Sequence, residues 1–233
     1  MKYVMADLHG AFDKYKRMLE TIDFREEDDL FVLGDVVDRG PDPVAILRDM
    51  AARANVVPIT GNHEVMALRV LRPLLAEITA ENYATQISPY VMRALTEYLQ
   101  NGGKTTLDGF RRLSPDDREA LASYLEEFLP YEVVKTGGRT FYLVHSGLGA
   151  FSPDKAMEDY TLEELAFLRP DYAARPFSDP NTFIICGHTP TLSLTGKAEI
   201  YRSGPWINID CGACFREGRL ACLRLDDLAV FYV

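Results

Sequence analysis

Histidine is scarce in this sequence, and every copy stands in a short polar segment that contains glycine. The chain has 233 residues and only four histidines. These lie in the segments Asp7-Leu8-His9-Gly10, Gly61-Asn62-His63-Glu64, His145-Ser146-Gly147 and Gly187-His188-Thr189. A fifth segment adds two carboxylates, in the order Gly34-Asp35-Val36-Val37-Asp38-Arg39-Gly40. Because Mn, Fe and Zn accept imidazole, carboxylate and amide oxygen as ligands, these residues predict a site for more than one divalent ion.

Each of these segments alone is weak evidence for a metal site. A single histidine after a strand is more often a core or surface residue than a ligand. Five glycine-flanked polar segments that use every histidine would be an unfavourable way to build a core, because buried polar groups cost free energy unless they are partnered. Together the five segments therefore favour metal binding.

The N-terminal third of the chain alternates short apolar runs with amphipathic segments. Apolar runs at 3–6, 30–33 and 56–59 predict strands, and helical spacing over 12–22 and 43–52 predicts two helices. This βαβαβ order predicts a parallel sheet, and ligands of such sheets collect at the carboxyl ends of the strands. The polar segments follow predicted strands, so their side chains should meet at equivalent strand ends.

The pattern changes twice beyond residue 66. Helical spacing predicts helices at 66–79, 89–100 and 115–129, an inserted helical layer over about 66–130 in which Asn101-Gly102-Gly103 forms a turn. Strands are then predicted at 131–134, 140–144, 182–186, 198–201, 206–210, 219–225 and 228–233, which indicates a second sheet. No repeat or linker divides the chain, so we expect an α/β (α+β) fold in one domain over 1–233.

Composition narrows the class of protein and its partners. Apolar residues make up 47% and charged residues 26%, which excludes disordered and collagen-like chains. A net charge of −10 would repel a polyanionic backbone, so we expect no nucleic-acid partner. The first ten residues lack an apolar signal region and no stretch approaches 18 uncharged apolar residues, so we expect no membrane partner and a cytoplasmic location.

Four cysteines, Cys186, Cys211, Cys214 and Cys222, offer a second chemistry. A reducing compartment argues against a disulfide framework. Cys211 and Cys214 form a CxxC, but no second CxxC or HxxxH completes a tetrahedral zinc site. We interpret the thiols as small residues of buried strands.

The five polar segments, in this order, resemble the motif series of the PPP-type serine/threonine phosphatases. This group lies within the calcineurin-like metallophosphoesterase superfamily, and the similarity is closest to its small bacterial and phage members. It runs from Asp7 to Thr189. Gly187-His188 is followed here by Thr189-Pro190 rather than by a further histidine, as in the PPP branch. The resemblance implies two mixed sheets packed face to face and flanked by helices.

The resemblance also implies how the ligands are divided between two divalent ions. Asp7, His9 and Asp35 would hold one ion, and Asp35 would bridge to the other. The second ion would then be held by Asp35, Asn62, His145 and His188. Mn is expected, and Fe, Zn or Ni would suit the same ligands.

Further residues acquire catalytic and substrate-binding expectations from the resemblance. His63 would be the general acid toward the leaving group, and Asp38 would hold its tautomer. Arg39 and Asn62 would contact the substrate phosphate, since a guanidinium offers a bidentate fork. A second phosphate-binding arginine is expected at Arg169, with Arg175 in the same loop as the alternative. The segment around Asn101-Gly102-Gly103 also resembles bacterial members, and no chemistry is assigned to it.

These expectations predict a phosphoric monoester hydrolase that uses a hydroxide held between two ions. Asp38 favours an alkoxide leaving group, so the substrate expected first is phosphoserine or phosphothreonine in a phosphoprotein or phosphopeptide. The alternative is a hydrolase of dinucleoside polyphosphates (Ap4A-type) or other nucleotides. A third interpretation, from another class, is a metal-bound interaction module without catalysis. The sequence leaves the oligomeric state open.

Overall fold

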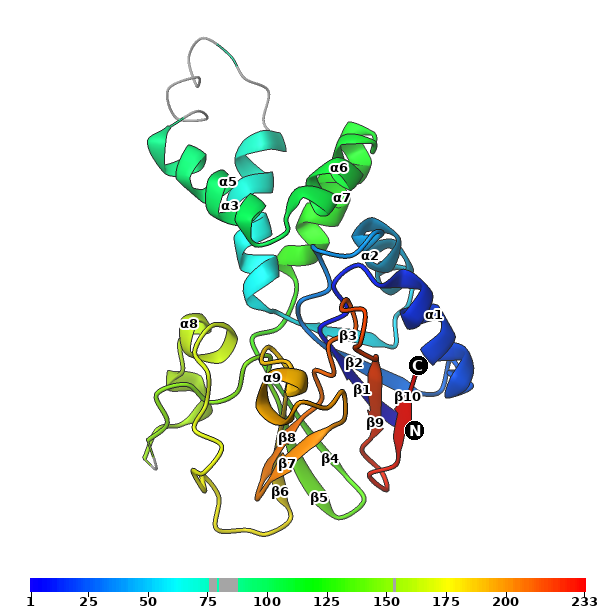
Figure 1. Cartoon of the computed structure of the whole chain (residues 1–233), viewed down its shortest axis with the longest axis vertical. Helices are drawn as coiled ribbons and strands as arrows, with labels where there is room; N and C mark the ends of the chain where they lie inside the picture. The colour runs from blue at the N-terminus through cyan, green and yellow to red at the C-terminus, as the bar shows by residue number, and fades with distance from the viewer. Residues whose placement is uncertain (76–78, 80–87, 153) are drawn as a thin grey trace.

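Two five-stranded sheets pack face to face in the computed structural model, as the resemblance implies (Figure 1). The structure describes residues 1–75, 79, 88–152 and 154–233. The strand order is β10-β9-β1-β2-β3 in the first sheet and β4-β5-β6-β8-β7 in the second. Both sheets mix parallel and antiparallel pairs. None of the helices in these described ranges is long and apolar enough to cross a membrane.

The predicted βαβαβ order is confirmed in the first sheet. Its parallel strands are β1 (Lys2–Ala6), β2 (Asp29–Leu33) and β3 (Val56–Ile59), joined by α1 (Phe12–Thr21) and α2 (Pro43–Ala51). The last two strands of the chain, β9 (Ala221–Arg224) and β10 (Val230–Tyr232), also join this sheet, although we expected them in the second. Antiparallel pairing of β9 with β1 covers a strand that would otherwise present an open edge.

The second sheet is built from the strands between residues 132 and 208. They are β4 (Glu132–Thr136), β5 (Arg139–Leu143), β6 (Thr182–Cys186), β7 (Tyr201–Ser203) and β8 (Trp206–Asn208). The chain between β5 and β6 includes η1 (Met157–Asp159) and α8 (Leu162–Ala166), and α9 (Thr191–Thr195) follows β6. Strands β5, β6 and β8 are parallel, so their carboxyl ends share one edge.

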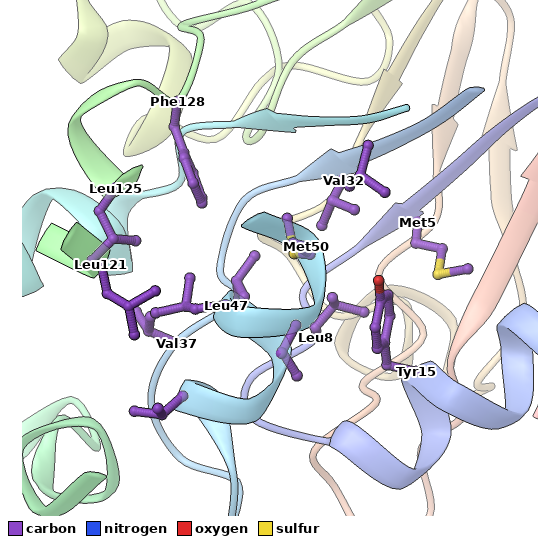
Figure 2. Packing of buried hydrophobic residues seen from close by; sticks show 14 of the residues in the cluster. Met5, Leu8, Tyr15, Val32, Val37, Leu47, Met50, Leu121, Leu125 and Phe128 are labelled. Carbon is purple, nitrogen blue, oxygen red and sulfur yellow. The ribbon is translucent and has the colours of Figure 1, made fainter. Parts of the chain in front are cut away.

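Successive side chains of β1 point to opposite faces of the first sheet and belong to two different layers of the core. Val4 and Ala6 join the cluster that includes Phe141 and Ile185 of the opposing sheet. Tyr3 and Met5 point to the other face, where they pack beneath the helices. Period-two alternation with both faces apolar is expected for a strand buried on both sides. Figure 2 shows Met5, Val32, Tyr15 and Met50 within this helix-facing cluster.

The helical layer is formed by α3 (Asn62–Leu75), α5 (Pro89–Gln100), α6 (Lys104–Arg111) and α7 (Pro115–Glu126). Helix α3 begins four residues before the predicted start at 66, because the polar residues after β3 already form its first turn; positions 76–78 of that prediction lie outside the described residues. Helix α6 was not predicted, since the turn at 101–103 precedes an unpromising run with two threonines and a glycine. Helix α7 starts as predicted, with Ser114 as its N-cap. Leu121 and Leu125 of α7 face the helix-facing core in Figure 2.

Candidate metal centre

The polar segments follow five different strands and converge from both sheets. Asp7 and His9 come after β1, and Asp35 comes after β2. Asn62 and His63 open α3 after β3. His145 follows β5 and His188 follows β6, both in the second sheet. The prediction that the polar side chains meet at strand ends is therefore confirmed, and the two sheets together supply the candidate ligands.

Backbone strain marks the same residues. Nine non-glycine residues in the described part of the chain have a positive φ. Six of them belong to the polar segments, namely Asp7, His9, Asp35, Asp38, Arg39 and His188. Left-handed conformations of non-glycine residues cost free energy and persist where surrounding contacts enforce them, which is typical of functional sites.

Asp35 lies at the middle of the cluster and faces two sets of imidazoles. Its Oδ1 lies 3.3 Å from Nε2 of His145, and its Oδ2 lies 3.4 Å from Nε2 of His9. Burial disfavours the charged carboxylate, but the imidazoles of His145, His63 and His9 together lower the pKa of Asp35. One carboxylate with its two oxygens directed to opposite ligand sets is suited to bridge two cations.

Asn62 closes the second set of ligands. Its Oδ1 lies 2.9 Å from Nδ1 of His188 and 3.1 Å from Nε2 of His145. The same two ring nitrogens are 3.2 Å apart. Within the described residues, Asp35, His145 and His188 form one of two groups of candidate ligands whose atoms lie within 4.8 Å of one another, and Asn62 adds an amide oxygen to this group.

The hydrogen bonds of two histidines direct their free nitrogens into the centre. His9 donates from Nδ1 to the carbonyl oxygen of Val37 at 2.9 Å, and His145 donates from Nδ1 to that of Leu33 at 2.7 Å. Because a backbone carbonyl only accepts, each bond assigns the proton to Nδ1 and leaves Nε2, which lies near Asp35, unprotonated and able to accept a hydrogen bond or to bind a cation. These two imidazoles are oriented as metal ligands are.

The electrostatics of the cluster also fit cations. Burial lowers the pKa of both His9 and His188 to about 3, so both are neutral, the form that binds metal, at neutral pH. Burial, together with the neighbouring carboxylates of Asp210 and Asp35, raises the pKa of Asp7 well above its usual range. Burial likewise raises the pKa of Asp210 to about 7. Buried carboxylates this close repel one another unless positive charge is supplied, and divalent ions supply it.

His63 has a separate partner. Its Nδ1 donates to Oδ2 of Asp38 at 2.6 Å, and its Nε2 lies 3.8 Å from Oδ2 of Asp35. Burial alone would lower the pKa of His63, but the carboxylates of Asp35 and Asp38 raise it. His63 also forms a group with His9 and Asp35 in which ligand atoms lie within 4.8 Å, so proximity alone would also allow it to bind an ion.

The helical layer holds Asp38 through Tyr98, which the sequence did not indicate, and through Thr106, which lies in the segment 101–107 that resembles bacterial members and to which no chemistry was assigned. The hydroxyl of Tyr98 in α5 donates to Oδ1 of Asp38 at 2.5 Å, and that of Thr106 in α6 donates to the same oxygen at 2.6 Å. The Thr106 oxygen also accepts from the backbone N–H of Asp38 at 2.9 Å. In the turn between these helices, to which no chemistry was assigned, the carbonyl oxygen of Gly102 accepts a hydrogen bond from the backbone N–H of Arg39. This segment therefore positions two neighbouring residues of the site.

Glu64 is a further buried carboxylate whose role was not predicted. One of its oxygens accepts the backbone N–H groups of Asp35 and Gly61, and the other accepts those of Val36 and Val37. Glu64 thereby ties the loop after β2 to the loop after β3. Its place beside Asn62 and His63 in one motif was the only signal for it in the sequence.

The three arginines considered for phosphate binding have different surroundings. The guanidinium of Arg39 donates to Nε2 of His9 at 2.9 Å and to Nε2 of His63 at 3.0 Å. Arg169 lies close enough to His188 to contribute to the low pKa of that imidazole, after burial and His145. Arg175 instead donates to the backbone carbonyls of residues 172, 173 and 174 in its own loop. Of the two candidates for the second arginine, Arg169 is the one whose charge acts on the pKa of a candidate ligand, His188.

The cysteines take no part in the cluster. Cys186, Cys211 and Cys222 are buried free thiols, and Cys214 is half-buried. In the part of the chain that the structure describes, neither group of clustered ligands includes a cysteine. Cys186 and Cys222 lie in buried strands, as interpreted, whereas Cys211 and Cys214 lie in the loop after β8.

Comparison with known proteins identifies similar sequences and folds. Residues 3–211 match the family model for calcineurin-like phosphoesterases. The symmetrical bis(5'-nucleosyl)-tetraphosphatase of Acidovorax sp. (strain JS42) is 30% identical over 148 residues, which cover 63% of this chain and 43% of that protein. The corresponding protein of Legionella pneumophila (strain Lens) is 44% identical over 71 residues, 30% of this chain and 26% of that protein. The chain spans less than half the length of these curated relatives.

Solved structures share the fold at low identity. A crystal structure described as that of a candidate diadenosine tetraphosphatase superimposes with a TM-score of 0.67 at 16% identity, covering 100% of this chain and 92% of that one. A serine/threonine phosphatase from Saccharomyces cerevisiae superimposes with a TM-score of 0.54 at 14% identity, covering 100% of this chain and 78% of that one.

Proposed function

The chain belongs to the calcineurin-like phosphoesterase family, and we propose that it hydrolyses symmetrical dinucleoside tetraphosphates to two nucleoside diphosphates. The observation that carries the proposed chemistry is the position of Asp35, whose two oxygens face two separate sets of ligands. The substrate is proposed from the curated relatives, which bear the name of a symmetrical bis(5'-nucleosyl)-tetraphosphatase. Of the substrates expected from the sequence, these relatives support the nucleotide better than the phosphoprotein.

The residues for two divalent ions are those derived from the motif series. One ion would be held by Asp7, His9 and Asp35, and the other by Asp35, Asn62, His145 and His188. When bound, two such ions neutralise phosphate charge and lower the pKa of a bound water to near neutrality. All of Mn, Fe, Zn and Ni accept this set of ligands, and we propose Mn as the first to test.

The remaining residues of the site would handle the phosphate and the proton. The guanidinium of Arg39 can bind two phosphate oxygens at once, and Arg169 would do so on the His188 side. His63, held by Asp38 through Nδ1, would in its imidazolium form donate the Nε2 proton to the oxygen that bridges the second and third phosphorus atoms, as the bond from that oxygen to the attacked phosphorus breaks. The hydroxyl from water remains on the other phosphorus, so each product is a nucleoside diphosphate.

A second candidate substrate is a phosphoserine or phosphothreonine residue. The observation that favours it is the pairing of His63 with Asp38 at 2.6 Å, because an alkoxide leaving group depends on a proton donor more than a phosphate does. The pairing serves either substrate, whereas the relatives point to the nucleotide.

A direct comparison of two substrates tests the proposal. With Mn²⁺ present, kcat/KM for diadenosine tetraphosphate should exceed that for a phosphothreonine peptide by about 100-fold, since a site that binds specific polar groups discriminates strongly against substrates that lack them. Chromatography should detect ADP as the sole nucleotide product. A preference for the peptide would favour the second candidate, and a metal-loaded protein inert toward both and toward aryl phosphates would favour the non-catalytic module.

Thr106 provides a test of how the helical layer supports the proton donor. Thr106→Val removes two hydrogen bonds to Asp38, and kcat for a phosphate ester with a poor leaving group should fall roughly 10-fold or more, given the strength of hydrogen bonds to charged groups. Hydrolysis of p-nitrophenyl phosphate, whose leaving group needs little protonation, should fall less. Thr106→Ser keeps the hydroxyl and should retain the kcat of the unaltered protein for both substrates; an equal loss on both substrates in Thr106→Val would contradict this role.

A further inference from the structure

A pocket of about 490 Å³ opens on the Arg39 side of the metal centre. Helix α1 contributes Phe12 and Lys14 to its wall, and the backbone at Gly40 contributes another part. The loop after β8 contributes Phe215 and Arg216. This volume lies within the range of about 300–1,000 Å³ that is usual for small-molecule sites.

The pocket is continuous with the residues that would bind phosphate. Gly40 follows Arg39 directly and donates its N–H to the carbonyl of His9 at 2.9 Å. Cys214, another lining residue, lies against the guanidinium of Arg39; burial raises the pKa of its thiol, and the guanidinium opposes that rise. A molecule whose phosphate contacts Arg39 can therefore extend into this pocket.

The wall is a built structure rather than a loose loop. Nζ of Lys14 donates to the carbonyls of Ala213 and Gly218 at 2.9 and 2.8 Å, which ties α1 to the loop. The N–H of Phe215 donates a hydrogen bond to the carbonyl of Gly212 at 2.9 Å. The Phe215 ring also lies so close to Gly212 that a side chain at residue 212 would collide with it. The ring of Phe215 is nevertheless 42% exposed. The fold thus fixes an aromatic residue at the pocket without burying it.

The charges of the pocket suit an anion that carries an aromatic group. Lys14 and Arg216 outnumber the single acid among the lining residues, Asp13, in a chain whose net charge is −10. By contrast, the residues that line the pocket between α3 and α8 include one cation, Arg69, and one acid, Glu163, whose charges cancel. Aromatic rings stack on nucleobases whatever the base, and cations contact the adjoining phosphates.

We propose that this pocket binds the nucleoside of a nucleoside diphosphate unit, with the base against Phe215 and Phe12 and the phosphates reaching from Arg216 and Lys14 toward Arg39. The inference rests on the proposed nucleotide substrate. It adds to that proposal the part of the molecule that recognises the nucleoside, which neither the metal ligands nor the phosphate arginines can do.

The test compares two inhibitors that differ only by the nucleoside. ADP and inorganic diphosphate are titrated against p-nitrophenyl phosphate hydrolysis by the Mn²⁺-loaded protein, with free Mn²⁺ held constant. ADP should bind about 10-fold more tightly than diphosphate, and Phe215→Ala should reduce that ratio to near one, because stacking typically supplies such a factor. Phe215→Trp should keep the ratio high.

Matched variants and outcomes separate this inference from the proposed function. Tyr90→Ala removes a 67% exposed aromatic ring outside the pocket and should leave both inhibition constants and turnover unchanged. Arg216→Ala, a second exposed position, should weaken the binding of ADP and of diphosphate alike, because Arg216 is proposed to contact the phosphates that both inhibitors carry. Equal inhibition by ADP and diphosphate in the unaltered protein would overturn the proposal that this pocket binds the nucleoside, even if diadenosine tetraphosphate is cleaved. A preference for ADP without cleavage of the tetraphosphate would overturn the proposed function, whereas the proposal that the pocket binds a nucleoside would stand.

Discussion

Asp35→Asn is expected to release both metal ions and to lower activity by roughly 10³-fold or more. Each carboxylate oxygen faces a different set of ligands, at 3.3 Å from His145 and 3.4 Å from His9, so loss of its charge weakens both sites together. Metal ions contribute several kcal/mol to stabilising a phosphoryl transition state, and about 1.4 kcal/mol corresponds to a factor of ten. Elemental analysis and kcat for p-nitrophenyl phosphate measure the two effects independently.

The substitution is suited to this position for a structural reason. Asp35 has a φ of 50°, a left-handed conformation that asparagine tolerates as well as aspartate does. The backbone should therefore keep its shape, and circular dichroism should be unchanged. Asp116→Asn, at an exposed position in α7, controls for the loss of one negative charge. A variant of Asp35 that retains two ions per chain would refute the bridging role.

His63→Asn is expected to slow substrates with poor leaving groups by roughly 10²–10⁴-fold, the usual contribution of general acid catalysis. The two ions should remain bound, because His63 is held by Asp38 and is not one of the proposed ligands. Aryl phosphates should be affected less, and so should diadenosine tetraphosphate, whose leaving group is a phosphate. The measurement is kcat across a series of leaving groups, together with metal content.

The outcome of this substitution distinguishes two roles of His63 that the geometry allows. Nε2 of His63 belongs to a compact group with His9 and Asp35, so it could serve as a ligand. In that case His63→Asn would lower metal content and slow every substrate equally. His63→Gln offers a second variant of similar volume, should the asparagine side chain itself take up an ion.

The strand ends were predictable from the sequence because parallel strands deliver their following loops to one edge. His9, His145 and His188 were each placed after a strand by the apolar runs that precede them, and the structure has these strands at β1, β5 and β6. Gly187 shows why glycine accompanies them, since a side chain there would collide with the carboxylate of Asp7. The spacing of apolar residues and the turn glycines thus carry most of the information about the site.

Contacts between distant segments were not predictable in this way. Tyr98 and Asp38 are separated by 60 residues, and nothing in the pattern around Tyr98 distinguishes it from other apolar positions of α5. The pairing of β9 with β1 was missed because alternation identifies a strand but not its neighbour. The sequence predicted a phosphoprotein first and a nucleotide as the alternative, and it could not decide between them for a similar reason: the motif residues specify phosphoryl chemistry, whereas the surface around them selects the molecule that carries the phosphate.

The origin of the ligands in both sheets has a consequence for the lifetime of the protein. Asp7, His9 and Asp35 follow strands of one sheet, and His145 and His188 follow strands of the other. Ions held between them would cross-link the two sheets, and their binding free energy would add to that of folding. A cell poor in divalent metal would then hold a chain that opens more often between its sheets and is degraded sooner. Metal supply would in this way govern how much of the protein persists as well as how fast it works.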